Sequence, residues 1–221
     1  MAVKRGTRGS VEEEIAYEAG RRAHYFAERR GRPTRLGQIS IQLYGHSLEL
    51  LTSPGVFSYR RLDTGTRLLI ESMEVAKGEL VLDLGCGYGP IAVAASLRGA
   101  IVAAVDVNYW ATCLAARNLE RYATAPWLVV WGNLYAPFNA RFDAILCNPP
   151  IRAGRSTVQA VVEESAKYLR DGGSLVLVAR TRMGAKTLSS LMARVFGEVE
   201  EVSKKSGYRV LRSRCRGGRV D

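Results

Sequence analysis

The stretch Val81-Leu82-Asp83-Leu84-Gly85-Cys86-Gly87-Tyr88-Gly89-Pro90 decides how this chain folds. It opens with a short apolar run around Asp83, which is typical of a strand buried in a sheet. Three glycines follow at alternate positions, and glycine lets a backbone turn sharply and approach a ligand closely. Pro90 suits the first position of a helix, whose free N–H groups then point back at the loop. The stretch therefore predicts a strand, a ligand-binding loop and a helix in succession.

The glycine spacing and the next two strand ends indicate the kind of ligand. A dinucleotide-binding loop has the pattern Gly-x-Gly-x-x-Gly, but here Gly89 comes one position early and Pro90 follows it. The next predicted strand ends at Asp106, about twenty residues beyond the loop, where an acid can accept both hydroxyls of a ribose. The third leads into Asn133, a polar side chain that suits an adenine edge. The alternative is a tight strand–helix turn without a ligand; the agreement of all three strand ends argues against it.

Strand–helix units repeat along the chain from about Leu62 onwards. Five short apolar runs are typical of strands buried on both faces, namely 80–84, 101–105, 128–131, 144–147 and 174–179. Helices are expected at 91–97, 110–122, 158–169 and 185–195. The segments 198–202 and 208–212 can pair as an antiparallel hairpin. We therefore expect an α/β fold, a doubly wound, Rossmann-like sheet of seven strands that ends in a C-terminal antiparallel hairpin.

A small N-terminal extension precedes these units. Residues 1–10 are polar, and we expect them to lack ordered structure. Residues 11–30 are rich in Glu, Ala and Arg and predict a helix, while 38–44 and 47–51 predict a β-hairpin. The expected division is an extension over 1–54, one domain over 55–215 and a basic tail over 216–221.

The charge of the chain favours a polyanionic partner. Its 221 residues carry a net charge of +11, which suits nucleic acid, although a soluble Arg-rich protein shows the same excess. Seven cations lie after Ser203, against the single acid Asp221: Lys204, Lys205, Arg209, Arg212, Arg214, Arg216 and Arg219.

Composition also argues against two classes of protein. No apolar run approaches the ~18 residues of a membrane span, and the start has no secretory signal, so we expect a cytoplasmic protein. The four cysteines show no Cys-x-x-Cys spacing and only two histidines occur. We therefore expect reduced cysteines and no metal site.

A second motif, Asn148-Pro149-Pro150-Ile151, ends the fourth predicted strand. An exocyclic amine on a base is a poor nucleophile, because its lone pair is delocalised into the ring. The Asn148 side-chain oxygen and the Pro149 carbonyl can accept the two amine protons and stabilise the positive charge that develops on alkylation. The prolines hold the backbone rigid. The alternative is a rigid loop in which Asn148 only caps the turn.

With both motifs, the chain resembles the class I S-adenosylmethionine-dependent methyltransferases over about residues 55–215. The resemblance implies that Asp83 and the glycine loop hold the amino-acid end of the cofactor, Asp106 the ribose and Asn133 the adenine. The full set of expected cofactor residues is Asp83, Gly85, Cys86, Gly87, Tyr88, Gly89, Asp106, Val107, Asn133, Leu134 and Asn148. The expected catalytic residues are Asn148, Pro149, Pro150 and Ile151. Ile151 stands where such amine methyltransferases carry an aromatic residue, which makes adenine-N6 methylation of DNA less attractive.

Further segments narrow the resemblance. Residues 55–58, 62–66, 148–154 and 207–211 are similar to the small-domain, RsmC-like rRNA guanine-N2 methyltransferases, and to their archaeal single-domain members. This implies transfer to guanine N2 of 16S ribosomal RNA, with that RNA or the small ribosomal subunit as partner and Phe57 and Ser58 near the active site. An apolar plug over the sheet edge is the alternative for 55–58. Arg152 and Arg155, with Arg180 and Arg182, are candidates for phosphate contacts around a flipped base.

Two other functions stay open at this point. One is methylation of adenine N6 or of a protein glutamine amide, which uses the amine motif but makes less use of the positive charge. The other is a non-catalytic RNA-binding or ribosome-assembly factor, against which the intact glycine loop, Asp106 and Asn148 argue.

Overall fold

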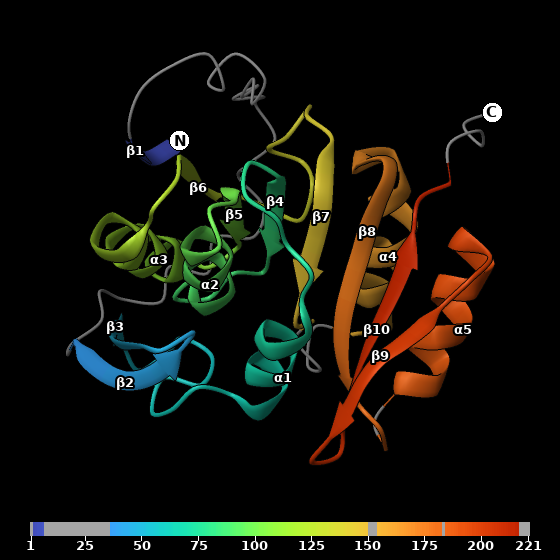
Figure 1. Cartoon of the computed structure of the whole chain (residues 1–221), viewed down its shortest axis with the longest axis horizontal. Coiled ribbons are helices and arrows are strands. Elements are labelled where there is room, and N and C mark those ends of the chain that lie inside the picture. Colours follow the sequence, from blue (N-terminus) through green and yellow to red (C-terminus); the bar gives the residue numbers. More distant parts are fainter. Residues whose placement is uncertain (1, 7–35, 150–153, 183, 217–221) are drawn as a thin grey trace.

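The computed structural model describes residues 2–6, 36–149, 154–182 and 184–216. At its centre lies one mixed sheet in the order β1-β6-β5-β4-β7-β8-β10-β9 (Figure 1). The strands that run parallel to one another are β4 (Leu80–Leu84), β5 (Ile101–Asp106), β6 (Trp127–Trp131), β7 (Phe142–Cys147) and β8 (Leu169–Arg180). Every residue of β4 is buried, as expected for the middle of a sheet covered on both faces.

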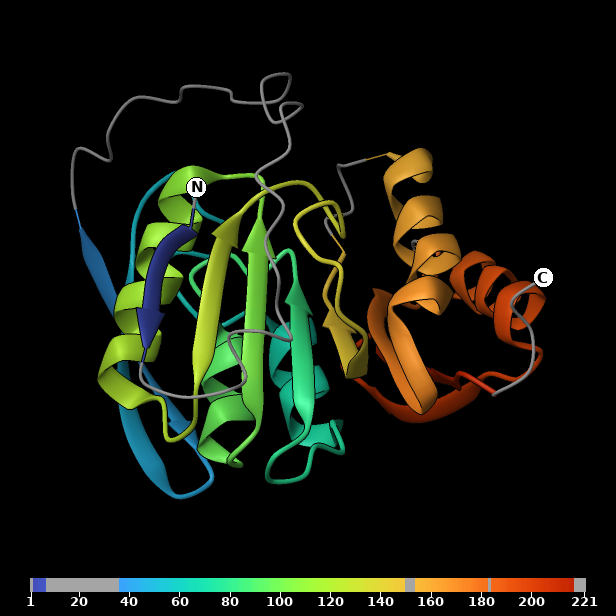
Figure 2. The ribbon, with the colours of Figure 1, turned by 90° about the horizontal axis from the view of Figure 1, so that it is seen from above.

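Antiparallel strands close both edges of the sheet. β10 (Tyr208–Arg214) pairs with β8, and β9 (Glu200–Lys205) pairs with β10. These seven strands confirm the predicted Rossmann-like sheet and its C-terminal hairpin. An eighth strand, β1 (Ala2–Gly6), pairs antiparallel with β6 and is seen beside it in Figure 2. The expectation that residues 1–10 lack ordered structure was therefore wrong for this segment, because an edge strand is ordered by its neighbour rather than by its own apolar pattern.

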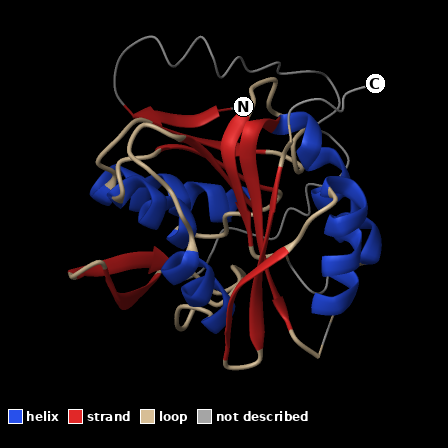
Figure 3. Ribbon diagram, turned by 45° about the vertical axis from the view of Figure 1, so that its right-hand side comes forward, coloured by secondary structure: helices blue, strands red, loops and turns tan. Residues whose placement is uncertain are grey.

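Helices cover the sheet on both faces (Figure 3). The helices are α1 (Thr64–Ser72), α2 (Pro90–Leu97), α3 (Tyr109–Tyr122), α4 (Arg155–Tyr168) and α5 (Ala185–Phe196). Buried side chains of α1, α2 and α3 form one apolar core with one face of the sheet. Those of α4 and α5 form a second core with the other face. The arrangement is doubly wound, as predicted.

Helix α1 was missed in the sequence. Its first turn contains Thr64, Gly65 and Thr66, which are weak helix formers. The signal that predicts it is Asp63, whose side chain accepts a hydrogen bond from Thr66 N at 3.1 Å and so caps the helix. The apolar residues Leu68–Ile70 that follow are buried, so tertiary packing stabilises the helix.

The predicted N-terminal hairpin is present as β2 (Gly37–Leu43) and β3 (His46–Thr52). Its inward residues join the apolar core of α1, α2 and α3. Asn118 of α3 fastens it, since its Oδ1 accepts from Leu51 N at 2.8 Å and its Nδ2 donates to Leu51 O at 3.0 Å. The same Nδ2 donates to Tyr88 O in the glycine loop at 2.8 Å. The predicted helix over 11–30 lies outside the described residues, and the domain boundaries at 54 and 215 remain predictions.

The described residues contain neither a membrane-spanning helix nor a cluster of metal-ligating side chains. None of the described helices is both long and apolar enough to cross a bilayer. No group of three or more potential metal-ligating side chains occurs among these residues, and all four cysteines are free thiols.

Candidate active site

The glycine loop lies at the carboxyl end of β4, where it turns into α2. Gly85 N and Cys86 N both donate to Val105 O of β5, at 2.9 and 3.0 Å. Gly85, Gly87 and Gly89 have φ angles of 76°, 57° and 85°, which side-chain-bearing residues rarely adopt. A Cβ added at Gly85 would meet no atom within 4 Å. The glycines therefore allow a backbone conformation that other residues rarely adopt, and the loop leaves open space beside Gly85.

Gly89 has a second constraint, which is packing. A Cβ at this position would lie 3.0 Å from the Cβ of Ala115 in α3. Cys86 and Tyr88 are buried, at 4% and 2% exposure, within the core beneath the loop. Their side chains therefore anchor the loop and leave mainly backbone groups for a ligand.

Asp83 is a buried carboxylate with one oxygen that forms no hydrogen bond among the described residues. Its side chain is fully buried, and its Oδ2 accepts from Ala92 N of α2 at 2.9 Å. Its Oδ1 is buried without a hydrogen-bond partner among the described residues. Burial raises the pKa of this carboxyl to about 7; the nearby Asp106 charge adds to the rise, and the Ala92 hydrogen bond opposes it. An unpaired buried acceptor is costly, so a cationic donor such as a ligand amino group fits this position.

Asp106 ends β5 beside the loop. Its Oδ2 accepts from Gly87 N at 2.9 Å, and its Oδ1 accepts from Asn108 N at 2.7 Å. Burial raises the pKa of this carboxyl as well, although both backbone hydrogen bonds oppose the shift. Each oxygen keeps a further lone pair, so the carboxylate can still accept ligand hydroxyls.

The predicted adenine side of the site is open to solvent. Val107 is 50% exposed, and its carbonyl is held by Trp131 Nε1 of β6 at 2.9 Å. Asn133 is exposed just beyond β6, while its backbone carbonyl accepts from Ala136 N at 3.1 Å. Leu134 follows at a positive φ of 47°. These residues line the same strand-end edge as Asp83 and Asp106.

Asn148 follows β7 directly, and its side chain is tied to α1. Its Nδ2 donates to Asp63 Oδ2 at 3.1 Å and to Thr66 Oγ1 at 2.8 Å. Pro149 is buried. Sequence reasoning did not identify Asp63 or Thr66 as partners of Asn148, because they are 85 and 82 positions away along the chain. The other expected residues of this motif, Pro150, Ile151 and Arg152, lie outside the described residues.

The segment from Gly55 to Ser58 lies over the glycine loop. Gly55 O accepts from Asn108 Nδ2 at 3.3 Å, and Val56 is buried at 6% exposure, with its Cγ1 4.0 Å from where a Cβ on Gly87 would stand. Phe57, by contrast, is 63% exposed. Ser58 turns the chain at a φ of 54°, and its Oγ donates to a backbone carbonyl three residues on. Val56 is therefore buried beside the glycine loop, whereas the Phe57 ring is exposed to solvent.

Cations without acidic partners gather near this edge. They are Arg60 and Arg61 before α1, Arg155 at the start of α4, Arg180 and Arg182 at the end of β8, and Lys204 and Lys205 at the end of β9. Within the described part of the chain, none of these seven forms an ion pair. Arg60 Nε donates instead to Tyr59 OH at 2.9 Å, and Arg180 Nε to Tyr208 OH at 3.0 Å.

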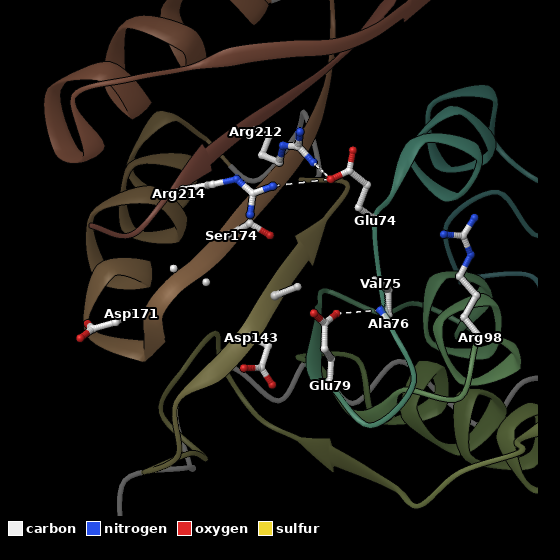
Figure 4. Close-up of a pocket in the computed structure, with 13 residues that line it drawn as sticks. Glu74, Val75, Ala76, Glu79, Arg98, Asp143, Asp171, Ser174, Arg212 and Arg214 are labelled. Carbon is white, nitrogen blue, oxygen red and sulfur yellow. Dashed lines mark hydrogen bonds and ion pairs between the residues drawn. The ribbon is translucent and has the colours of Figure 1, made fainter. Parts of the chain in front are cut away.

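Four other C-terminal arginines form ion pairs with glutamates within the described residues. Glu74 pairs with both Arg212 and Arg214 beside a cavity of about 570 Å³ at the amino ends of the parallel strands (Figure 4). Further pairs join Arg209 to Glu201 at 2.6 Å and Arg216 to Glu198 at 2.5 Å. In the sequence these arginines count toward the positive charge that favours a polyanionic partner, and the structure adds that each of them has a glutamate partner.

Comparisons with known proteins agree with this geometry. A family model described as "Methyltransferase small domain" matches residues 47–212. The uncharacterized protein YbxB of Bacillus subtilis is 33% identical over 86% of this chain and 98% of its own length. The ribosomal RNA small subunit methyltransferase C of Alcanivorax borkumensis is 33% identical over 79% of this chain, but over only 56% of its own length.

Among solved structures, the T. thermophilus 16S rRNA N2 G1207 methyltransferase RsmC, in complex with AdoMet and guanosine, superposes with a TM-score of 0.75 at 28% identity. The match covers 83% of this chain and 52% of that protein. The chain thus spans about half the length of the rRNA methyltransferases it matches. The family match, the relatives and the glycine loop agree, and the chain belongs to the methyltransferase small-domain family, whose members use S-adenosylmethionine.

Proposed function

We propose that this protein transfers a methyl group from S-adenosylmethionine to the exocyclic N2 amine of guanine in 16S ribosomal RNA. The observation that carries the proposal is the amide of Asn148, held at the end of β7 with its NH2 group bound to α1. An amine acceptor site needs an oxygen at this edge, and the bound NH2 leaves the amide oxygen for that purpose. The RsmC structure with AdoMet and guanosine supports the choice of base.

The cofactor residues proposed here follow from the strand ends. The cofactor supplies a methyl group on a positively charged sulfur. Asp83 and the backbone of the glycine loop receive the amino-acid end, Asp106 and Val107 the ribose, and Asn133 and Leu134 the adenine. The buried, unpaired Oδ1 of Asp83 and the open space beside Gly85 support this orientation.

The acceptor amine is oriented by hydrogen-bond acceptors rather than deprotonated by a strong base. Asn148 Oδ1 and the carbonyl of Pro149 accept its two protons, which stabilises the positive charge that develops on nitrogen. Positioning then supplies much of the rate, since displacement requires the nitrogen lone pair to point at the methyl carbon. Pro150 and Ile151 belong to the same proposed site through the sequence motif alone.

RNA is proposed to approach the carboxyl-end edge of the sheet. The exposed ring of Phe57 suits stacking on an unpaired base, a contact that supports single-stranded and flipped nucleotides. Ser58, Arg152 and Arg155 complete the proposed substrate site. The cations without acidic partners at this edge suit phosphate contacts.

The test is methyl transfer from labelled S-adenosylmethionine to 16S rRNA, free and within immature 30S particles, followed by nucleoside analysis. The proposal predicts label in N2-methylguanosine. Label in N6-methyladenosine, or in protein glutamine instead of RNA, would contradict the proposed substrate. Absence of both transfer and S-adenosylmethionine binding would favour a non-catalytic ribosome-assembly factor.

A further inference from the structure

We infer that Asp63 and Thr66 are positioning residues that set the orientation of the Asn148 amide, so that its oxygen rather than its NH2 group faces the acceptor amine. The inference rests on the proposed function, because it explains how Asn148 is prepared for that role. No part of the sequence resemblance assigned a role to either residue.

The Asn148 amide is oriented through the two hydrogens of its NH2 group. An NH2 group has two donors, and both are used here: one on Asp63 Oδ2 at 3.1 Å and one on Thr66 Oγ1 at 2.8 Å. An ionised carboxylate only accepts hydrogen bonds. Rotating the amide by half a turn would bring Oδ1 against the carboxylate and leave Asp63 without this donor. Asp63 therefore selects one of the two amide orientations.

Asp63 is itself held in place by contacts on two sides. Its Oδ2 also caps α1 through Thr66 N at 3.1 Å. On the other side, Tyr208 OH of β10 lies 3.5 Å from Asp63 Oδ1. Tyr208 packs so closely on α1 that a Cβ on Gly65 would lie 2.7 Å from its Cε1 atom. The Asp63 carboxylate is thus held in place by α1 and by β10, so it can fix the orientation of the Asn148 amide.

The variant Asp63→Asn distinguishes control of the Asn148 amide orientation from simple tethering of α1 to β7. Asparagine caps a helix about as well as aspartate, so Asp63→Asn keeps the cap. An asparagine at this position can, however, donate as well as accept. It therefore tolerates both orientations of the Asn148 amide. A structural tether would survive this substitution, whereas orientation control would not.

The experiment compares Asp63→Asn, Thr66→Val and Thr66→Ser with the wild-type protein in the rRNA methyl-transfer assay. For Asp63→Asn we expect kcat to fall about 100-fold, the effect of a small misplacement of a reacting group. For Thr66→Val we expect a fall of roughly 3- to 10-fold, as for one neutral hydrogen bond, and Thr66→Ser should restore the rate because it retains the acceptor. KM for RNA, the dissociation constant of S-adenosylmethionine and the melting temperature should stay near their wild-type values.

The matched control is Asp143→Asn, at the amino end of β7. Asp143 is also a partly buried aspartate that holds a backbone N–H, that of Leu80 at 2.8 Å, but it lies at the opposite edge of the sheet. This variant should retain the wild-type kcat. Wild-type kcat in Asp63→Asn would overturn the inference, as would a loss of kcat matched by equal losses of cofactor affinity and melting temperature.

Asn148→Ala distinguishes failure of the positioning role of Asp63 and Thr66 from failure of the role proposed for Asn148 itself. If Asn148→Ala is inactive while Asp63→Asn is fully active, the inference fails and the proposed role of Asn148 stands. If Asn148→Ala retains full transfer, the proposed role of Asn148 fails and the positioning role fails with it.

Discussion

The two edges of the parallel sheet are built from the same five strands, yet they offer a partner very different surfaces. At the carboxyl ends lie the buried Asp83, the partly buried Asp106, the bent glycine loop, Asn148 and the exposed Phe57. At the amino ends lies a cavity in which Glu74 meets Arg212 and Arg214 (Figure 4). Several cations at the carboxyl edge form no ion pair within the described residues, whereas Arg212 and Arg214 at the amino edge pair with Glu74.

This difference shows why a net charge alone does not locate a binding surface. The chain carries +11 overall, but an arginine paired with glutamate contributes little field at a distance. Cations without acidic partners among the described residues, such as Arg61, Arg182 and Lys204, lie toward the edge that also carries the glycine loop. The proposed phosphate contacts and the proposed methyl-transfer site therefore lie at the same edge of the sheet.

The largest expected effect comes from removing the Asn148 side chain at the carboxyl edge of the sheet. Asn148→Ala should lower kcat for rRNA methylation by about 10²- to 10³-fold, the usual effect of removing one donor or acceptor that stabilises charge in a transition state. The dissociation constant of S-adenosylmethionine, measured by calorimetry, should change little. Equal losses in transfer and in cofactor affinity would show that Asn148 serves cofactor binding instead.

The next effect concerns the pH dependence of cofactor affinity. The pKa of Asp83 is raised to about 7, so the carboxylate that is expected to receive the cofactor amino group becomes protonated as pH falls below this value. Affinity for S-adenosylmethionine should therefore be about tenfold weaker at pH 6 than at pH 8. Asp83→Asn should remove most of this dependence, as measured by calorimetry across that range. A wild-type profile that is flat from pH 6 to 8 would contradict the assignment.

The same carboxyl also makes a stability prediction. Its folded-state pKa lies above the ordinary aspartate value, so between about pH 4 and 7 the folded state binds more protons than the unfolded state. The free energy of unfolding of the cofactor-free protein should therefore decrease as pH rises through that window. Asp83→Asn should show a smaller decrease in urea unfolding experiments, and an unchanged slope would argue that Asp83 is ionised throughout.

Two double variants test whether the position of a positive charge, and not only the net charge, governs the affinity for rRNA. Arg61→Ala with Arg182→Ala removes two charges from the carboxyl edge, and Arg214→Ala with Arg216→Ala removes two paired charges from elsewhere. The first double variant should raise KM for rRNA about tenfold and reduce the slope of log affinity against log salt by about 2. The second should leave KM within about twofold, because these charges are already paired. Equal effects would mean that only the net charge matters.

The smallest expected effect is at the exposed ring. Phe57→Ala should raise KM for rRNA about fivefold through lost base stacking, whereas Phe57→Trp should keep it near the wild-type value. Steady-state kinetics with both variants measures this. An equal rise in KM for Phe57→Trp would contradict a stacking role.

Local patterns predicted the parts of the molecule that depend on local physics. The apolar run and glycines around Asp83 defined β4, its loop and α2, and Asp106 was recognised from its place at the end of the next strand. Helix α1 was missed because Gly65 and its threonine neighbours weaken the helical signal, although the Asp63 cap was readable. β1 was missed because its partner strand, β6, is more than 100 residues away along the chain.

The contacts that sequence reasoning missed join residues far apart in the chain. Asp63 and Asn148 are 85 positions apart, and Arg212 and Glu74 are 138 apart. No periodicity connects such pairs, since the fold alone brings them together. The positions of the candidate site residues at strand ends were therefore predictable, while the contacts of Asn148 with α1 and the pairing of the C-terminal arginines required the structure. The roles of the site residues stay predictions.

Cross-linking of bound 16S rRNA by ultraviolet light, followed by mass spectrometry of the linked peptides, tests most directly whether RNA meets the carboxyl edge. We expect cross-links at residues 57–61 and 180–182, and these should disappear in competition with unlabelled rRNA. Cross-links concentrated instead at Glu74 to Glu79 and at Arg212 to Arg216 would contradict binding at the carboxyl edge.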